Sequence, residues 1–327
     1  MLIVRAPVRI TFGGGGTDLP SYYSSFGGFS VTAAIDKYVY IVLHDRFDPG
    51  YRFSYSKTEI IDRAEDIQHP VIREAVKLIG PFEPLELISI ADLPARTGLG
   101  SSGAFAVAVL NALHIFRKEH VPPGVLAEEA CQISIEKLHE PSGKQDEYTA
   151  AYGGINSFGI SMDGKVNVSP LRISRATVSE LQSQLLLFYT GITRESKVIL
   201  EAQRQATADR DENTLERLHR VKQIGIDSKN ALEDGNLHEF GRLLREHWET
   251  KRLLAGNTTT PELDATYDLA LKNGADGGKI MGAGGGGFFM FHCESDRRKL
   301  IEALQKHGLR QLDFKFEYEG CKAVADL

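Results

Sequence analysis

The sequence predicts an α+β protein built from two domains. In its first half, short segments rich in β-branched and aromatic residues alternate with helical patterns. Residues 195–255 hold long helical patterns with few turn signals, and the chain closes on strand and helix patterns. A chain of 327 residues is long enough for two domains of ordinary size. We place the boundary near residue 178, which gives an N-terminal domain of residues 1–178 and a C-terminal domain of residues 179–327.

The N-terminal domain is expected to pack helices against strands. Strand-forming residues are concentrated at 2–12, 38–47 and 85–93. In residues 70–80, apolar side chains recur every three and four positions, which predicts a helix that Gly80 ends. Further helices are predicted at residues 103–118 and 124–140, with the sequence VPPG between them.

The C-terminal domain is expected to begin with a buried strand at residues 184–191. Near the end of the chain, residues 287–293 read as a second strand. A helix then follows, capped by Ser295 and ended by Gly308. Residues 312–319 alternate between apolar and charged side chains, which predicts a half-buried antiparallel strand.

Composition narrows the class of protein. Hydrophobic residues make up 42% and charged residues 25% of the chain, as in a globular protein with a substantial core. The net charge of −6 argues against a general nucleic-acid binder. No apolar run reaches the ~20 residues of a membrane span, and the first residues lack the apolar core of a signal peptide. Three scattered cysteines support neither zinc nor disulfides, so we expect a reducing, cytoplasmic compartment.

Three glycine-rich segments, FGGGGTDLP (12–20), GLGSSG (98–103) and GAGGGG (282–287), require a common explanation. GLGSSG follows a predicted strand and opens a predicted helix, where unpaired N–H groups favour a phosphate. Its glycines fit the dinucleotide fingerprint, but KEHVPPG stands where that fold needs a second strand. No Walker A sequence is present. The alternative is a tight turn whose serines only cap the helix.

The segment LPARTGLGSSGAFAVA resembles the Pro-x-x-x-Gly-Leu-Gly-Ser-Ser signature of the GHMP kinases. APVRITFGGGGTDLPSYY (6–23) is similar to the N-terminal substrate motif of that family, and GGKIMGAGGGGFF (277–289) to its C-terminal glycine loop. The resemblance implies the two-domain GHMP kinase fold, with a ferredoxin-like C-terminal domain and the active site in the cleft between domains. The implied cofactors are ATP and Mg²⁺.

The implied nucleotide-binding and loop residues follow from these motifs. For the nucleotide they are Arg96, Thr97, Gly98, Leu99, Gly100, Ser101, Ser102 and Gly103. For the C-terminal glycine loop they are Lys279, Gly282, Gly284, Gly285 and Gly286.

Within the family, the chain resembles a sugar-kinase branch. GKQDEYTAAYGG (143–154), YTGITRESK (189–197) and HWETKRLL (247–254) look like the bacterial D-glycero-D-manno-heptose 7-phosphate kinases. This implies ATP-dependent phosphorylation of the anomeric hydroxyl, giving the 1,7-bisphosphate for nucleotide-activated heptose synthesis. Another sugar, such as fucose or unphosphorylated heptose, and a non-catalytic sugar or ATP sensor remain alternatives. A homodimer is also left open.

The resemblance implies roles for the catalytic and metal-binding residues. Asp146 is the candidate base for the sugar hydroxyl, with Arg9 beside it, where a guanidinium favours a charged carboxylate. Ser102 and Glu136 are the candidate Mg²⁺ ligands, since hard oxygen ligands suit this ion. Each has a structural alternative: a turn residue for Asp146, a surface strand position for Arg9 and a solvated helix charge for Glu136.

The resemblance also implies substrate-binding residues. In the N-terminal motif, the glycines shape a turn that presents Asp18 to sugar hydroxyls, and the alternative is a hairpin turn capped by Asp18. A phosphate at the far end of a heptose would need cations. The full set is Gly15, Gly16, Thr17 and Asp18 for the sugar, with Lys144, Arg194 and Lys197 for its phosphate.

Overall fold

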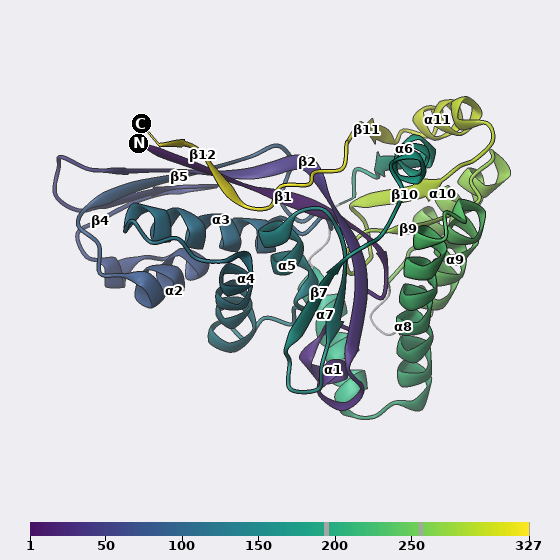
Figure 1. Ribbon diagram of the computed structural model, residues 1–327, viewed down its shortest axis with the longest axis horizontal. Helices are drawn as coiled ribbons and strands as arrows, with labels where there is room; N and C mark the ends of the chain where they lie inside the picture. The colour runs from purple at the N-terminus through teal and green to yellow at the C-terminus, as the bar shows by residue number, and fades with distance from the viewer. Residues whose placement is uncertain (193–195, 255–257, 327) are drawn as a thin grey trace.

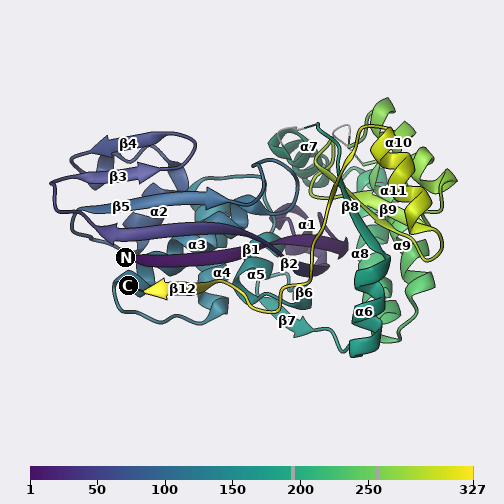
Figure 2. The ribbon, with the colours of Figure 1, turned by 90° about the horizontal axis from the view of Figure 1, so that it is seen from above.

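A computed structural model describes residues 1–192, 196–254 and 258–326. In these residues the first sheet has eight strands, with β6 and β7 branching from β2 and the others ordered β12-β1-β2-β5-β3-β4 (Figure 1). The strands are β1 (Leu2–Gly13), β2 (Gly28–Asp45), β3 (Tyr51–Ser54), β4 (Thr58–Ile61), β5 (Leu85–Ala91), β6 (Ile155–Ile160), β7 (Val166–Pro170) and β12 (Lys322–Asp326). The last of these brings the end of the chain back beside its start (Figure 2).

Helices cover one face of this sheet. They are α2 (Pro70–Ile79), α3 (Ser101–Phe116), α4 (Pro123–Cys131) and α5 (Gln145–Tyr152), while α1 (Pro20–Phe26) follows β1 (Figure 1). Helix α3 is apolar on nearly all sides and is buried against β1, β2 and α5, as expected of a central helix. Its N-terminus therefore has a fixed position beside the start of α5.

The second sheet is antiparallel, in the order β11-β8-β10-β9. Its strands are β8 (Leu185–Tyr189), β9 (Gly277–Ile280), β10 (Phe288–His292) and β11 (Arg310–Leu312). The helices of this half are α6 (Arg175–Gln184), α7 (Ser196–Ala208), α8 (Glu212–Glu233), α9 (Leu237–Lys251), α10 (Pro261–Lys272) and α11 (Arg297–Lys306).

The two halves share one core. Helix α8 packs on β1 and β2, and the rings of Phe12 and Phe240 meet edge to face with centroids 5.3 Å apart. Residue 178 lies inside α6, and β12 belongs to the first sheet, so the chain crosses between the sheets twice. The domain boundary at 178 stays a prediction.

Most predicted elements are present in the structure. The ends of five predicted elements agree with the structure to within two residues: the strands at 2–12, 85–93 and 184–191 and the helices at 70–80 and 103–118. The predicted helix 124–140 changes character instead, because α4 ends at Cys131 and a π-helix, η2 (Gln132–Lys137), continues it. None of the described helices combines the length and the apolar run needed to cross a membrane.

Two local predictions were wrong. Residues 312–319 do not form a strand, apart from the end of β11 and a single bridge between Phe316 and Ile35. A few backbone hydrogen bonds around this bridge and two side chains hold the segment: Gln182 Oε1 accepts from Phe316 N at 2.9 Å, and Asp36 Oδ1 accepts from Lys315 N at 2.8 Å. Helix α11 is capped by Asp296 rather than Ser295, since Asp296 Oδ1 accepts from Lys299 N.

Candidate active site

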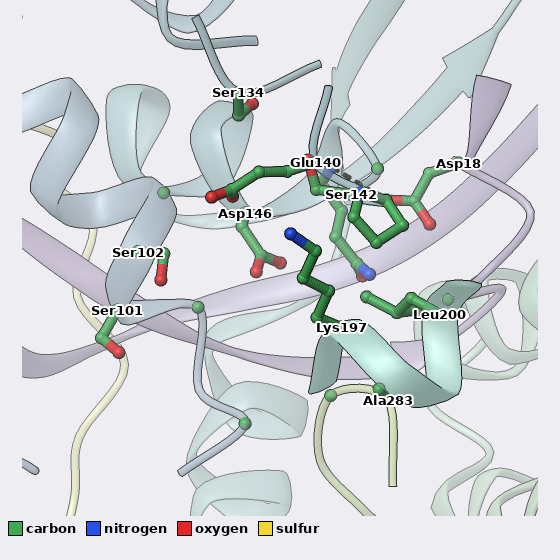
Figure 3. A pocket seen from close by; sticks show the side chains of 18 of the residues that line it. Asp18, Ser101, Ser102, Ser134, Glu140, Ser142, Asp146, Lys197, Leu200 and Ala283 are labelled. Atoms are coloured by element: carbon green, nitrogen blue, oxygen red, sulfur yellow. Dashed lines mark hydrogen bonds between the residues drawn. The ribbon is translucent and has the colours of Figure 1, made fainter. Parts of the chain in front are cut away.

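A cleft of about 470 Å³ lies between the N-termini of α3 and α5 on one side and the glycine loop with α7 on the other (Figure 3). Segments far apart in the sequence therefore meet here. The predicted site residues that line it are Arg9, Gly15, Gly16, Asp18, Arg96, Gly98, Gly100, Ser101, Ser102, Gly103, Asp146, Lys197, Gly282, Gly284 and Gly286.

The N-terminus of α3 opens into this cleft without a side-chain cap. Its N-cap residue is Gly100, in a left-handed conformation with φ of 77°, so neither serine caps the helix. The first N–H groups of an α-helix lack intrahelical partners and carry the positive end of the helix dipole. This end of α3 is thus suited to binding a phosphate group, with the Ser101 and Ser102 hydroxyls beside it (Figure 3).

The GLGSSG and GAGGGG loops touch backbone to backbone. Gly98 has φ of +82°, and a Cβ built on it would lie 2.4 Å from the carbonyl oxygen of Met281. A Cβ on Gly282 would in turn lie 2.8 Å from the Cα of Gly98. The glycines at these two positions therefore allow the loops to pack closely, which holds the two sides of the cleft together.

We expect Gly98→Ala to lower the free energy of unfolding by at least about 2 kcal/mol. The left-handed backbone disfavours a Cβ by roughly 1–2 kcal/mol, and the contact with Met281 adds to this cost. Urea denaturation followed by circular dichroism measures the change. Gly159→Ala is a matched control in β6, because a Cβ there meets no atom within 4 Å. Equal stabilities for the two variants would contradict the proposed loop contact.

Arg9 joins three parts of the site. Its backbone N–H donates to Leu99 O at 2.9 Å, and one guanidinium nitrogen donates to Gly98 O at 2.5 Å. Its Nε and Nη2 lie 2.8 and 2.7 Å from Asp146 Oδ1. The Arg9 side chain is only 4% exposed and that of Asp146 29%. Because both contacts fall on Oδ1, Oδ2 of Asp146 can receive a proton from a molecule in the cleft.

Asp18 follows the glycine run at the end of β1 and bonds to it. Asp18 Oδ1 accepts from Gly16 N at 2.9 Å, and its Oδ2 accepts from Gln145 N at 3.1 Å. Burial raises the pKa of Asp18, while these two hydrogen bonds favour its charged form. Gly143 leaves room for this carboxylate, since a Cβ there would lie 2.0 Å from Oδ2. Asp18 thus lies on the cleft wall, next to the first residue of α5.

Two predicted residues lie in a different pocket. Lys144 donates to Glu128 Oε1 at 2.9 Å and to Gly164 O at 2.7 Å, so its charge is already paired away from the cleft. Glu136 lines the same second pocket and is exposed. Within η2, Ser134 lines the cleft and Glu136 does not. Glu136 and Ser102 therefore line different pockets, and their pairing around a metal ion stays a prediction that this placement does not favour.

Other predicted residues lie within the glycine-rich loops or pack against them, away from the cleft. Thr17 and Thr97 are buried and bond backbone oxygens, and Leu99 is a core residue. Lys279 is buried behind the glycine loop, with Nζ 3.4 Å from His247 Nε2. Gly285 N bonds Thr258 O. These side chains do not line the cleft in the described residues, and Arg194 lies outside those residues.

Sequence patterns did not single out Lys251, which the structure places on the cleft wall. It is the last residue of α9, is only 6% exposed and donates to Gly282 O at 2.5 Å. Burial and the charge of Arg9 lower the pKa of Lys251 to about 8. A helical lysine is usually solvated, so only its packing against the glycine loop reveals it.

Two family models match parts of this chain. The model of the GHMP kinases N terminal domain matches residues 67–154, and that of the GHMP kinases C terminal matches residues 228–309. The chain is 32% identical to D-glycero-alpha-D-manno-heptose 7-phosphate kinase of Campylobacter jejuni, over 98% of this chain and 97% of that protein. It is also 30% identical to L-fucokinase/L-fucose-1-P guanylyltransferase of Bacteroides fragilis, over 87% of this chain and 34% of that protein.

A solved structure has the same fold. The crystal structure of a D-glycero-D-manno-heptose 1-phosphate kinase from Bacteroides thetaiotaomicron superimposes with a TM-score of 0.83 and 25% identity, covering 100% of both chains.

Proposed function

Because the chain belongs to the GHMP kinase family, we propose that it transfers the γ-phosphate of ATP to the anomeric hydroxyl of D-glycero-D-manno-heptose 7-phosphate. The product would be the 1,7-bisphosphate, an intermediate of nucleotide-activated heptose synthesis. The broader statement is established by the family: the chain is an ATP-dependent phosphotransferase that acts on an alcohol group. The named Campylobacter relative supports the narrower one, and the solved structure, which is named a heptose 1-phosphate kinase, supports a heptose phosphate as the substrate class.

One observation carries the proposed reaction: the Arg9–Asp146 pair lies beside the uncapped N-terminus of α3. The helix end would bind the phosphates of ATP, and Asp146 would face a hydroxyl placed next to them. The packing of the two helices fixes this arrangement, since a Cβ on Gly103 would lie only 2.8 Å from Asp146 Cβ. Phosphoryl transfer depends mainly on such positioning and on charge neutralisation.

In the proposed step, the sugar hydroxyl oxygen attacks the γ-phosphorus of ATP. A new P–O bond forms as the bond to the β–γ bridging oxygen breaks, and ADP leaves. Asp146 accepts the hydroxyl proton at Oδ2, while Arg9 holds Oδ1 and fixes the orientation of the carboxylate. Asp18 would accept hydrogen bonds from other sugar hydroxyls. A divalent cation, when bound, would neutralise charge on the ATP phosphates.

Two lysines on the cleft wall are suited to binding the phosphate of the substrate. The Lys197 side chain extends from α7 toward Asp146 (Figure 3), and Lys251 is buried against the glycine loop. Lys251 lies close enough to Arg9 and Lys279 for their charges to act on one another, so an anion in the cleft would reduce this repulsion. We propose Lys251 and Lys197, in place of Lys144, as the residues that bind this phosphate.

A panel of sugars tests the proposed acceptor. ADP release would be measured with Mg²⁺-ATP and heptose 7-phosphate, mannose 6-phosphate, free heptose, fucose or galactose, with mevalonate as a further control. We expect heptose 7-phosphate to give the highest kcat/KM. Turnover that is highest with fucose or free heptose would leave the kinase function intact and refute the heptose 7-phosphate assignment.

The three free cysteines agree with the cytoplasmic compartment that we propose for this reaction.

A further inference from the structure

The cleft contains a buried carboxylate that the proposed transfer step does not use. Glu147, in the first turn of α5, is 4% exposed and lines the cleft beside Asp146. Its Oε1 accepts from Ser134 Oγ at 3.2 Å. Its Oε2 is buried and has no hydrogen-bond partner within the described parts of the chain. Buried polar atoms without partners are rare and costly, so this oxygen requires a physical explanation.

The position of Glu147 is fixed relative to the N-terminus of α3. A Cβ built on Gly103 would lie 3.0 Å from the backbone nitrogen of Glu147, so the first turns of the two helices are in contact. Ser102, which precedes Gly103, is exposed to the cleft. One hydroxyl and one carboxylate thus flank the place where the helix end would bind phosphates. These are hard oxygen ligands, the kind that Mg²⁺ prefers alongside water and substrate phosphates.

The negative charges on the side of the cleft that carries Glu147 also favour a cation. Glu147 is buried, and the carboxylate of Asp146, the preceding residue, lines the same cleft. Asp18 is a further carboxylate that lines this cleft. Arg9 forms an ion pair with Asp146, but no ion pair compensates Glu147 within the described residues. A bound divalent cation would supply the missing positive charge.

The other acids near the cleft fit less well. Glu136 lines the second pocket, so it does not face Ser102. Glu140 lines the cleft, and its side chain extends toward Asp146 in Figure 3, but it is exposed and solvent can satisfy its oxygens.

We propose that Glu147, together with Ser102, binds the divalent cation of the nucleotide complex in this protein. This inference rests on the proposed kinase function and assigns a residue within it.

Manganese binding tests the assignment without relying on turnover. Mn²⁺ replaces Mg²⁺, and electron paramagnetic resonance measures its affinity for the full chain saturated with ADP, with Mn²⁺ and ADP alone as the blank. We expect Glu147→Gln to weaken Mn²⁺ binding by about tenfold or more, as loss of a group at a metal site does. Glu136→Gln and Glu140→Gln are the matched controls and should bind Mn²⁺ as the wild type does.

A second variant keeps the test valid if Glu147→Gln does not fold. Glu147→Asp keeps the charge but shortens the side chain, so we expect it to be folded by circular dichroism and to bind Mn²⁺ more weakly. Unchanged Mn²⁺ affinity in the folded Glu147 variants would overturn the inference, as would weakening confined to Glu140→Gln or Glu136→Gln. In either case, ADP release by the wild-type protein with a sugar would still report separately on the kinase function.

Discussion

Replacing Asp146 by asparagine is expected to lower kcat by about 100- to 10,000-fold, the usual contribution of a positioned general base. Asparagine has nearly the same shape, and its oxygen can still accept the Arg9 hydrogen bonds made by Asp146 Oδ1. It cannot take the proton from the sugar hydroxyl at the position of Oδ2. Binding of ATP should be preserved, because the N-terminus of α3 is unchanged. ADP release and calorimetry with a non-hydrolysable ATP analogue measure the two effects.

The matched control for this variant is Asp163→Asn. Asp163 is an exposed acid paired with Lys165 in the second pocket, so its loss should leave kcat unchanged. A folded Asp146→Asn variant that bound the ATP analogue and turned over at nearly the wild-type rate would contradict the assignment of Asp146 as the base.

Replacing Lys251 by methionine is expected to lower kcat/KM for a sugar phosphate by about 10- to 150-fold. This range corresponds to the loss of one hydrogen bond to a charged group, roughly 1.5–3 kcal/mol. The effect should be much smaller with an unphosphorylated sugar. Lys144→Met is the comparison variant. Because Lys144 is paired with Glu128 outside the cleft, this substitution should leave the KM unchanged. An equal loss with both kinds of sugar would place Lys251 at the γ-phosphate of ATP instead.

The pKa of Lys251 predicts a pH dependence of substrate binding. The lowered value of about 8 means that the ammonium of the empty cleft loses its proton as the pH rises through 8. A bound phosphate favours the charged form, so affinity is full below this pH and falls above it. We expect the KM for the sugar phosphate to rise between pH 7 and 9 in the wild type. In Lys251→Met the same profile should be flat, and a rise of equal size there would assign the titration to another group.

The sequence predicted the parts of the site that depend on local backbone geometry. A strand, a glycine-rich loop and a helix of small residues together place the uncapped N-terminus of α3, and all of these features are continuous in the chain. The Arg9–Asp146 pair was found through motif resemblance, which records long-range contacts that residue spacing alone does not contain. The pairing could not have been derived from the pattern of β1 or of α5 taken separately.

The structure places two predicted residues outside the cleft and a further lysine on it, for reasons that the sequence pattern does not contain. Lys144 and Asp146 are two positions apart, and residues at this spacing do not share a helix face. Lys144 accordingly bonds Glu128 in the second pocket while Asp146 faces the cleft. Glu136 lies in the π-helix η2, whose presence no sequence pattern indicated, and lines the second pocket. Lys251 was missed because its burial depends on a glycine loop 31 residues later in the chain.

The most direct test of the account is to identify the product by ³¹P nuclear magnetic resonance. The wild-type protein would be incubated with Mg²⁺-ATP and heptose 7-phosphate, with the Asp146→Asn variant as the control. With the wild-type protein, we expect a second sugar phosphate signal that is coupled to the anomeric proton. With the Asp146→Asn variant, this signal should form much more slowly. A phosphate on a different hydroxyl would contradict the proposed reaction. So would the lack of any new phosphate on heptose 7-phosphate when another sugar is phosphorylated.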